Sequence, residues 1–353
     1  MTWYDPAVLP IRKPSLGQNP DGATPEVVTS MPGDEVVPSK EKEEAPRPRF
    51  RLQPPIKAPF WIKGIPFFLS AFLFLSGIFA LFAPLPIILL GIQSNRKWAW
   101  LAALTNGAIV GLTMGVPSLA VYITTILALA LFLPEYLKPG RSLASVAGLT
   151  LLTIAVTGLV WVAGYSQFHH VNPWLEFRTD LNDGLDYLLK SISPEARTNL
   201  LGGLETEEWK HAFVIELPSR IAVLSLVLVW LNLVVVLRLN PVGIRERMGL
   251  DGSFFKRWKA PEILIWPVIA VGFVALLDSG WIADVAKNIL YFLAAIFVFQ
   301  GLSILSFLLD AWGAKGPLRT IAFLVALLLM MPLLLAMGFF DLWFDFRSKL
   351  RQA

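Results

Sequence analysis

The stretch SRIAVLSLVLVWLNLVVVLRL, residues 219–239, decides the fold class. It contains no acidic residue and carries its two arginines, Arg220 and Arg238, near its ends. A helix of about twenty apolar residues is long enough to cross the roughly 30 Å of hydrocarbon in a bilayer. Similar apolar runs, separated by short polar gaps, recur from residue 64 to residue 340. The sequence therefore predicts an all-α, polytopic transmembrane helix bundle.

The composition supports a membrane protein and excludes several kinds of chemistry. Hydrophobic residues make up 55% of the chain, which is above the usual share in soluble domains. The net charge is +4; basic residues of membrane proteins collect in cytoplasmic loops, so we expect no nucleic-acid partner. The chain has no cysteine, which excludes disulfides, thiolate catalysis, cysteine-ligated metals and lipid attachment through cysteine.

Residues 1–62 differ from the rest of the chain. They are rich in proline and include the charged run KEKEE at 40–44. Such a segment buries too little apolar surface to fold, so we predict a disordered cytoplasmic tail. A proline-rich docking site for a partner is the alternative. Basic residues between 47 and 63 precede the first apolar run, which favours a cytoplasmic N-terminus.

Two prolines, Pro84 and Pro86, interrupt the first apolar run. Prolines at this spacing stop a helix, so we expect residues 87–92 to form a short segment that returns towards the side of entry. The first bundle half spans 63–165 and the second spans 219–340, with about eight full crossings plus this proline-broken segment. The full crossings are predicted at 64–82, 98–114, 117–133, 143–165, 220–239, 261–277, 283–309 and 318–340.

A polar insertion at 166–218 separates the two bundle halves. Its acidic residues outnumber its basic ones, whereas the loop at 240–259 is mainly basic. Basic loops face the cytoplasm, so we predict a cytoplasmic loop at 240–259 and an extracytoplasmic insertion. A full crossing at 318–340 would then place the interfacial C-terminal tail, 341–353, at the outer face.

The insertion also carries an amphipathic helical pattern. Leu181, Leu185 and Leu188 recur at helical spacing, opposite Asp180 and Asp183. This pattern predicts a helix that lies on the outer membrane surface or covers the bundle.

Small residues recur every four positions between 103 and 115 and define a ladder: Ala103, Gly107, Gly111 and Gly115. Residues four apart share one helix face, so the ladder forms a groove that another helix can approach closely. The neighbour is either another helix of this chain or a separate membrane subunit.

Three amides lie near the middle of predicted spans: Asn106, Asn232 and Gln300. An amide at membrane depth costs free energy unless it has a hydrogen-bond partner. These three are the candidate substrate-binding residues if they face one cavity. Bonds between helices are the alternative for each.

No set of residues indicates catalysis. The adjacent His169 and His170 lie near Glu176 and Asp180, but neighbouring side chains seldom point at one ion. Glycine-rich nucleotide loops and nucleophile motifs are also missing from the sequence. We therefore predict no catalytic residue, no metal and no cofactor, and we expect a protein that is not an enzyme.

Two motifs towards the C-terminus carry a family resemblance. The first is Phe-x-x-Trp-Lys-x-Pro-Glu over 255–262, and the second is Leu-x-x-x-Gly-x-x-Asp-x-x-x-Asp-x-Arg over 334–347. With Pro218 before the span that holds Asn232, they resemble the YybS-like family of bacterial integral membrane proteins, over roughly residues 59–349. The motif residues taken as candidates are Trp258, Pro261, Asp341, Asp345 and Arg347.

The resemblance implies a domain of unknown function. It also implies a helix arrangement distantly similar to the substrate-binding subunits of energy-coupling-factor transporters and to MreD-type cell-shape proteins. Those transporter subunits present their small-residue face on the first helix and usually have fewer spans, and the proline-rich tail lies outside the shared pattern.

We predict a multi-pass protein of the bacterial cytoplasmic membrane that acts as a non-catalytic, transport-type subunit. It would bind an unidentified small molecule, with the bilayer and another membrane subunit as partners. The alternative is a structural scaffold for envelope, cell-shape or division machinery. The first requires a polar-lined pocket open to the outer face, and the second a packed interior with an exposed groove.

Overall fold

The computed structural model describes residues 64–277 and 280–348, and over these residues it contains helices and no strand. The all-α prediction is confirmed. The predicted tail at 1–62 lies outside the described residues. The first helices are α2 (Pro66–Leu75), α3 (Leu85–Gln93), α4 (Arg96–Val121), α5 (Ala128–Tyr136), α6 (Leu143–His169), α7 (Pro173–Ser191) and α8 (Pro194–Leu201). They are followed by α9 (Thr206–Leu239), α10 (Ile244–Arg247), α11 (Phe254–Arg257), α12 (Ile265–Ala275), α13 (Trp281–Ala311), α14 (Gly316–Leu329) and α15 (Met331–Phe344).

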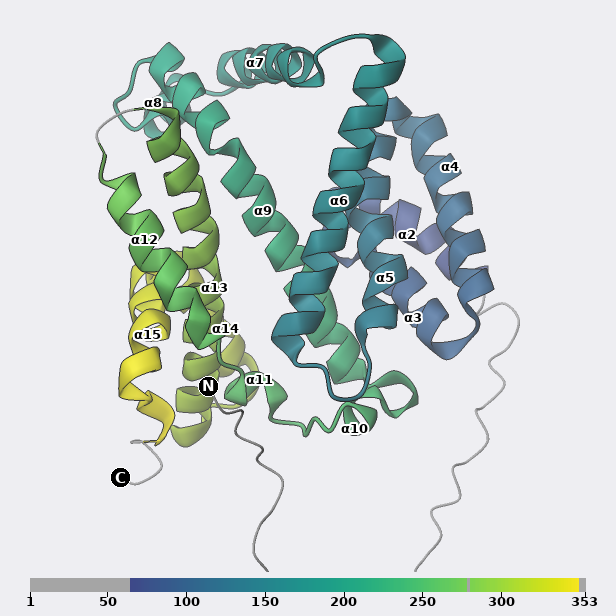
Figure 1. Cartoon of the computed structure of the whole chain (residues 1–353), viewed down its shortest axis with the longest axis vertical. Coiled ribbons are helices and arrows are strands. Elements are labelled where there is room, and N and C mark those ends of the chain that lie inside the picture. The colour runs from purple at the N-terminus through teal and green to yellow at the C-terminus, as the bar shows by residue number, and fades with distance from the viewer. Residues whose placement is uncertain (1–63, 278–279, 349–353) are drawn as a thin grey trace, which may run out of the picture. The chain divides into compact units, whose positions relative to one another are not determined.

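Four helical stretches in the described part of the chain are long and apolar enough to cross a membrane: 96–136, 143–169, 206–239 and 281–311. The pair α14 and α15 is bent by 95° and gives a fifth if it is counted as one span. The shorter apolar helices, among them α2 and α12, fall below that length. In Figure 1, α7 and α8 lie at one end of the bundle, and α10 and α11 lie at the other.

The stretch 96–136 reverses direction at Gly115. This glycine has a φ of +80° and a ψ of −176° inside α4, a backbone conformation that residues with a side chain rarely adopt. A Cβ added to Gly111 would lie 3.1 Å from Leu119 Cδ2, and one added to Gly107 would lie 3.8 Å from Leu127 Cδ1. The segments before and after Gly115 therefore pack against each other as a hairpin, in line with the two spans predicted at 98–114 and 117–133.

The predicted first span, 64–82, is not one helix. The helix α2 ends at Leu75, because Gly77 takes a left-handed φ of +67°, and a short 3-10 turn follows at Ala80–Phe82. The helix α3 then begins with Pro86 in its first turn, where the missing N–H of proline costs nothing. The prolines thus start the returning segment, which is longer than the predicted 87–92.

The boundary predicted between the insertion and the next span, at Pro218, lies inside the continuous helix α9. Proline has no N–H and disturbs the bonds of the turn before it. An amide of α13 repairs this turn: the N–H of Ser219 donates to Asn288 Oδ1 at 2.8 Å, and Asn288 Nδ2 donates to the carbonyl of Ile215 at 2.9 Å. The helix thereby passes through the proline without ending.

The predicted span at 318–340 is not one straight helix, because the chain bends by 95° between α14 and α15. Met330 leaves the helical conformation, and Pro332 stands in the first turn of α15, where proline cannot continue the preceding helix. Arg347 then hydrogen-bonds to the carbonyls of Lys256 and Trp258. The end of α15 therefore lies at the same end of the bundle as the loop at 240–259, which overturns its predicted place at the opposite face.

A single apolar cluster fills the space between α2, α3, α4, α5, α6 and α9 and extends to α10 and α11. In it, α3 contacts α5 and α9, and α6 also contacts α9. Burying each large aliphatic or aromatic side chain in such a cluster removes it from lipid and fixes the neighbouring helices by packing. Its fully buried members include Ile87, Ile88, Val110, Tyr122, Leu129, Leu133, Val229, Leu233, Val236 and Leu237.

Candidate functional site

The three predicted amides are all fully buried, but they lie in different places. Asn106, on α4, holds α2: its Oδ1 accepts from the N–H of Ala71 at 2.7 Å, and its Nδ2 donates to the carbonyl of Pro66 at 2.9 Å. The same Nδ2 donates to the carbonyl of Ala102 in its own helix at 2.7 Å. Asn106 therefore joins α4 to α2 by hydrogen bonds.

Asn232, on α9, reaches the broken first helix pair. Its Nδ2 donates to the carbonyl of Leu81 at 2.9 Å and to that of Leu228 at 2.8 Å. The Leu81 carbonyl belongs to the 3-10 turn at Ala80–Phe82, where the backbone lacks regular helical bonds. Asn232 Oδ1 has no hydrogen-bond partner among the described residues.

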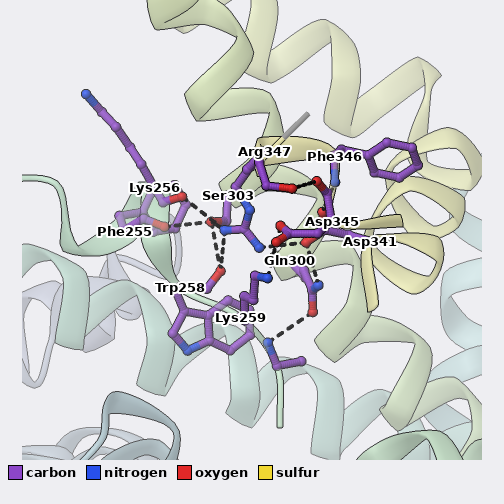
Figure 2. A network of polar contacts seen from close by, with 12 residues as sticks. Phe255, Lys256, Trp258, Lys259, Gln300, Ser303, Asp341, Asp345, Phe346 and Arg347 are labelled. Atoms are coloured by element: carbon purple, nitrogen blue, oxygen red, sulfur yellow. Dashed lines mark hydrogen bonds and ion pairs between the residues drawn. The ribbon is translucent and has the colours of Figure 1, made fainter. Parts of the chain in front are cut away.

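Gln300, on α13, lies in the polar network drawn in Figure 2. Its Oε1 accepts from the N–H of Ala260 at 3.0 Å, and its Nε2 donates to Asp341 Oδ2 at 3.0 Å. One amide thereby links the loop before α12, the middle of α13 and the end of α15.

A buried ion pair forms the centre of this network. Arg347 Nη2 donates to Asp341 Oδ2 at 2.6 Å, and the two side chains are 4% and 0% exposed. The other oxygen, Asp341 Oδ1, accepts from the N–H of Phe346 at 3.0 Å. The carboxylate thus accepts from three donors, one of them a guanidinium, and is a satisfied buried charge.

The remaining contacts of Arg347 fix the loop at 255–260. Its Nη1 donates to the carbonyls of Lys256 and Trp258 at 3.0 and 2.9 Å. Ser303, on α13, donates to the carbonyl of Phe255 at 2.7 Å. The indole ring of Trp258 packs on Trp230 of α9, with ring centroids 4.6 Å apart. The network therefore holds three segments far apart in the sequence in one arrangement (Figure 2).

An ion pair lies at the edge of the network, where Lys259 Nζ is 3.0 Å from an oxygen of Asp345. Both side chains are partly exposed. The hydrogen bond from Lys259 lowers the pKa of Asp345 below its ordinary value, against the smaller opposing effect of burial. Asp345 also ends α15 in the left-handed conformation, with a φ of +39°.

Four of the five motif residues thus meet in one place: Trp258, Asp341, Asp345 and Arg347. Pro261, the fifth, starts the turn that leads into α12. Ser303 and Asn288 were missed from the sequence; as polar residues inside an apolar run, they carried the same signal as Gln300. The hydrogen bonds of this network join the end of α15 to α13 and to the segment before α12, whereas Arg347 Nε and Trp258 Nε1 have no partner among the described residues.

The closest backbone approach involves two glycines outside the predicted ladder. A Cβ on Gly301 of α13 would overlap the carbonyl of Leu334, and a Cβ on Gly338 of α15 would overlap the carbonyl of Phe297. In the ladder, Gly107 and Gly111 face leucine side chains of their own hairpin. At these two ladder positions, the neighbouring segment therefore belongs to the same chain.

The predicted amphipathic helix corresponds to α7. Leu185 and Leu189 are buried, and Asp186 accepts from Lys210 of α9 at 2.9 Å, which lowers the pKa of Asp186.

No group of three or more His, Asp or Glu side chains in the described ranges is arranged to hold a metal. His169 packs on Tyr165, with ring centroids 4.4 Å apart.

The surface pockets in the described part of the molecule include one near Asp310 and one near Glu216. One, of about 340 Å³, lies between α11 and α13 and is lined by Lys256, Arg257 and Asp310. The other, of about 410 Å³, follows α9 from Glu216 to Val227 and is bounded by Tyr291 of α13. Neither pocket is lined by any of the three predicted amides.

Comparison with known proteins gives a family and no function. No curated protein and no solved structure matches the chain. A family model described as "Predicted membrane protein (DUF2232)" matches residues 65–342. The match covers the first C-terminal motif and the second as far as Leu342, and it ends before Asp345 and Arg347. The chain therefore belongs to the DUF2232 family of predicted membrane proteins.

Proposed function

We propose that this protein is a non-catalytic scaffold in the bacterial cytoplasmic membrane, where it holds envelope, cell-shape or division machinery. The observation that supports the proposal is that the buried amides form hydrogen bonds with other segments of the same chain. Asn106, Asn232 and Gln300 each bond to backbone or side chains of another segment of this chain. A packed interior of this kind suits a protein that presents a fixed surface to partners.

A solute-binding, transport-type subunit is the second candidate. The pocket along α9 supports it, because it is open and has Glu216 and Arg220 at one end. The resemblance to YybS-like proteins, and through them to energy-coupling-factor subunits and MreD-type proteins, is compatible with either function. A shared helix arrangement does not decide between them.

The proposed membrane arrangement has six crossings and two bent helix pairs, in place of eight full crossings. The hairpin at 96–136 supplies two of the six, and the shorter apolar segment 262–275, which contains α12, supplies one. The first pair, α2 and α3, begins and ends at one side: Phe67 packs on Trp98, with ring centroids 6.2 Å apart, and α3 leads directly to Arg96. Its middle reaches Asn232, inside the apolar part of α9 at 220–239. The pair α14 and α15 makes a similar return.

Loop charges support a cytoplasmic N-terminus in this arrangement. The basic loops that hold Arg96, Arg141 and Arg245 would face the cytoplasm, and α7 and α8 would be extracytoplasmic. Alkaline phosphatase fused near Gly203 should be active, and a fluorescent protein fused near Gly252 or after Ala353 should fluoresce. An inactive fusion at Gly203 together with a dark one at Gly252 would invert the arrangement.

The scaffold and solute-binding functions make opposite predictions for exchange of the amides. Asn106→Leu, Asn232→Leu and Gln300→Leu should each lower the free energy of unfolding in detergent by about 0.6–2 kcal/mol, because each amide bonds another segment. A residue that serves a solute would instead tolerate leucine, since removal of an unpaired buried amide is neutral or favourable.

Thr105→Val is the matched control, because the Thr105 hydroxyl donates only within its own helix, to the carbonyl of Leu101. Molecules that copurify with each variant are measured by mass spectrometry. Unchanged stability in the three leucine variants, combined with loss of a copurifying solute, would reject the scaffold in favour of solute binding.

A further inference from the structure

The pocket along α9 has one polar and one apolar end. Glu216 and Arg220 lie at the first end, and Val223, Leu224 and Val227 continue one face of the helix towards the second. Residues at this spacing share a helix face. Tyr291 of α13 forms the opposite side. The pocket is therefore an elongated groove that changes from charged to apolar along its length.

The two ends match two depths of a bilayer. The distance from Arg220 to Arg238 along α9 is about 27 Å at 1.5 Å per residue, close to the roughly 30 Å of the hydrocarbon layer. These two arginines therefore mark the boundaries of the layer. Glu216 and Arg220 lie at headgroup level on the side of α7 and α8, and Val227 lies about 10 Å deeper, among acyl chains.

The charged end can recognise both signs of charge. Glu216 Oε2 and Arg220 Nη2 are 2.7 Å apart, with side chains 35% and 53% exposed. This ion pair uses one oxygen of the carboxylate and one nitrogen of a guanidinium that has five N–H donors. The guanidinium also lies over the ring of Phe213, 4.9 Å from its centroid, which holds it beside the groove. A phosphate can bind Arg220 while an ammonium binds Glu216.

The groove is preformed at its charged end. Ser219 lines it, and the N–H of Ser219 is bonded to Asn288 of α13. Asn288 also bonds the carbonyls of Ile215 and Asp284, so α9 and α13 are fixed to each other beside the groove. A site that needs little rearrangement loses less free energy on binding.

We propose that this groove binds one zwitterionic phospholipid, with its ammonium on Glu216, its phosphate on Arg220 and the start of an acyl chain along Val223, Leu224 and Val227. The match of charge and depth separates this site from the apolar lipid-facing surfaces of α6 and α12, which offer no paired charges. The proposal depends on the membrane location and not on the scaffold function.

The test measures lipids retained by the full-length protein in mild detergent, by native mass spectrometry, after exposure to equal amounts of phosphatidylethanolamine and phosphatidylglycerol. The native protein should retain phosphatidylethanolamine preferentially. Glu216→Gln should reduce that retention about tenfold, because one charge-assisted bond is lost, while phosphatidylglycerol is still held by Arg220. Arg220→Gln should reduce retention of both lipids.

Two variants control for general effects. Arg96→Gln removes a partly exposed ion pair with Glu135 at the start of α4 and should leave lipid retention unchanged. Val227→Trp should fill the deep end and release both lipids, whereas Leu159→Trp, on the exposed face of α6, should not. Equal retention of the two lipids by the native protein, or a Glu216→Gln variant that behaves like Arg96→Gln, overturns the proposal.

Discussion

The two bent helix pairs are held to the bundle in different ways. Polar groups buried in an apolar bundle are costly unless they are paired. Around the break between α2 and α3 the contacts are neutral: Asn232 donates to the carbonyl of Leu81, and Ser70 donates to that of Ala83 at 2.6 Å. In the second pair the buried contacts lie at the end of α15, away from the break at Met330, and are ionic: Asp341 and Arg347 hold the chain end against α13 and residues 256–258.

The difference indicates unequal dependence on single residues. Loss of one neutral hydrogen bond removes a small net contribution, whereas loss of one member of a buried ion pair leaves an uncompensated charge. One substitution in the second pair should therefore lower the free energy of unfolding strongly, whereas one substitution in the first pair should lower it less. Three changes test this comparison in order of expected effect.

Arg347→Met should have the largest effect. It leaves Asp341 buried without its guanidinium, and breaking one side of a buried pair costs about 3–5 kcal/mol. The measurement is the free energy of unfolding in detergent, with protease access at the C-terminal segment as a local readout. The double variant Asp341→Leu with Arg347→Met should recover part of the loss, because no charge stays buried.

A double variant no more stable than Arg347→Met alone would contradict a charge-based role. Ser70→Ala gives the matched change in the first pair. It removes the hydrogen bond to the carbonyl of Ala83 and the one to the buried hydroxyl of Tyr122, and should cost about 1–3 kcal/mol.

The second change concerns the glycines where helices touch. Gly338→Ala should displace α15 from α13, because the added Cβ overlaps the carbonyl of Phe297. Overpacking of this kind costs about 1–3 kcal/mol or more. Gly91→Ala in α3 is the matched control, since its Cβ would meet Ala99 at 3.4 Å, an ordinary contact. Equal stability losses in the two variants would show that α15 can shift away from α13 at little cost in free energy.

The same glycines show how far the sequence could predict the fold. A signal carried by neighbouring residues was read correctly: the break at Gly115, between the segments predicted at 98–114 and 117–133, separates two packed segments. A ladder of small residues is visible because its members are four apart on one helix. Gly301 and Gly338 belong to different helices, so no spacing connects them before the chain is folded.

The sequence identified most residues of the candidate site, but it did not show that they form one network. Asp341, Asp345 and Arg347 were selected from one motif, and Gln300 was selected separately as a polar residue at membrane depth. Their meeting depends on a bond between positions 300 and 341, which periodicity cannot reveal. The bend before α15 had a local signal in Pro332, inside an apolar run, and reading that run as one span reversed the predicted side of the C-terminus.

The smallest effect should come from the exposed edge of the ionic network. Because Lys259 lowers the pKa of Asp345, the folded carboxylate binds protons less readily than the unfolded one. Its stabilisation is therefore fully present above the unfolded pKa, about 3.9, and is lost as pH falls through the lower folded value. Partial exposure of both side chains limits the contribution to below about 1 kcal/mol. Melting temperatures between pH 6 and pH 3 should fall more steeply for the native protein than for Lys259→Met, with Lys138→Met as the control. Identical slopes would mean that the second helix pair is held by Asp341 and Arg347 without this outer ion pair, and the comparison would then depend on the buried charges alone.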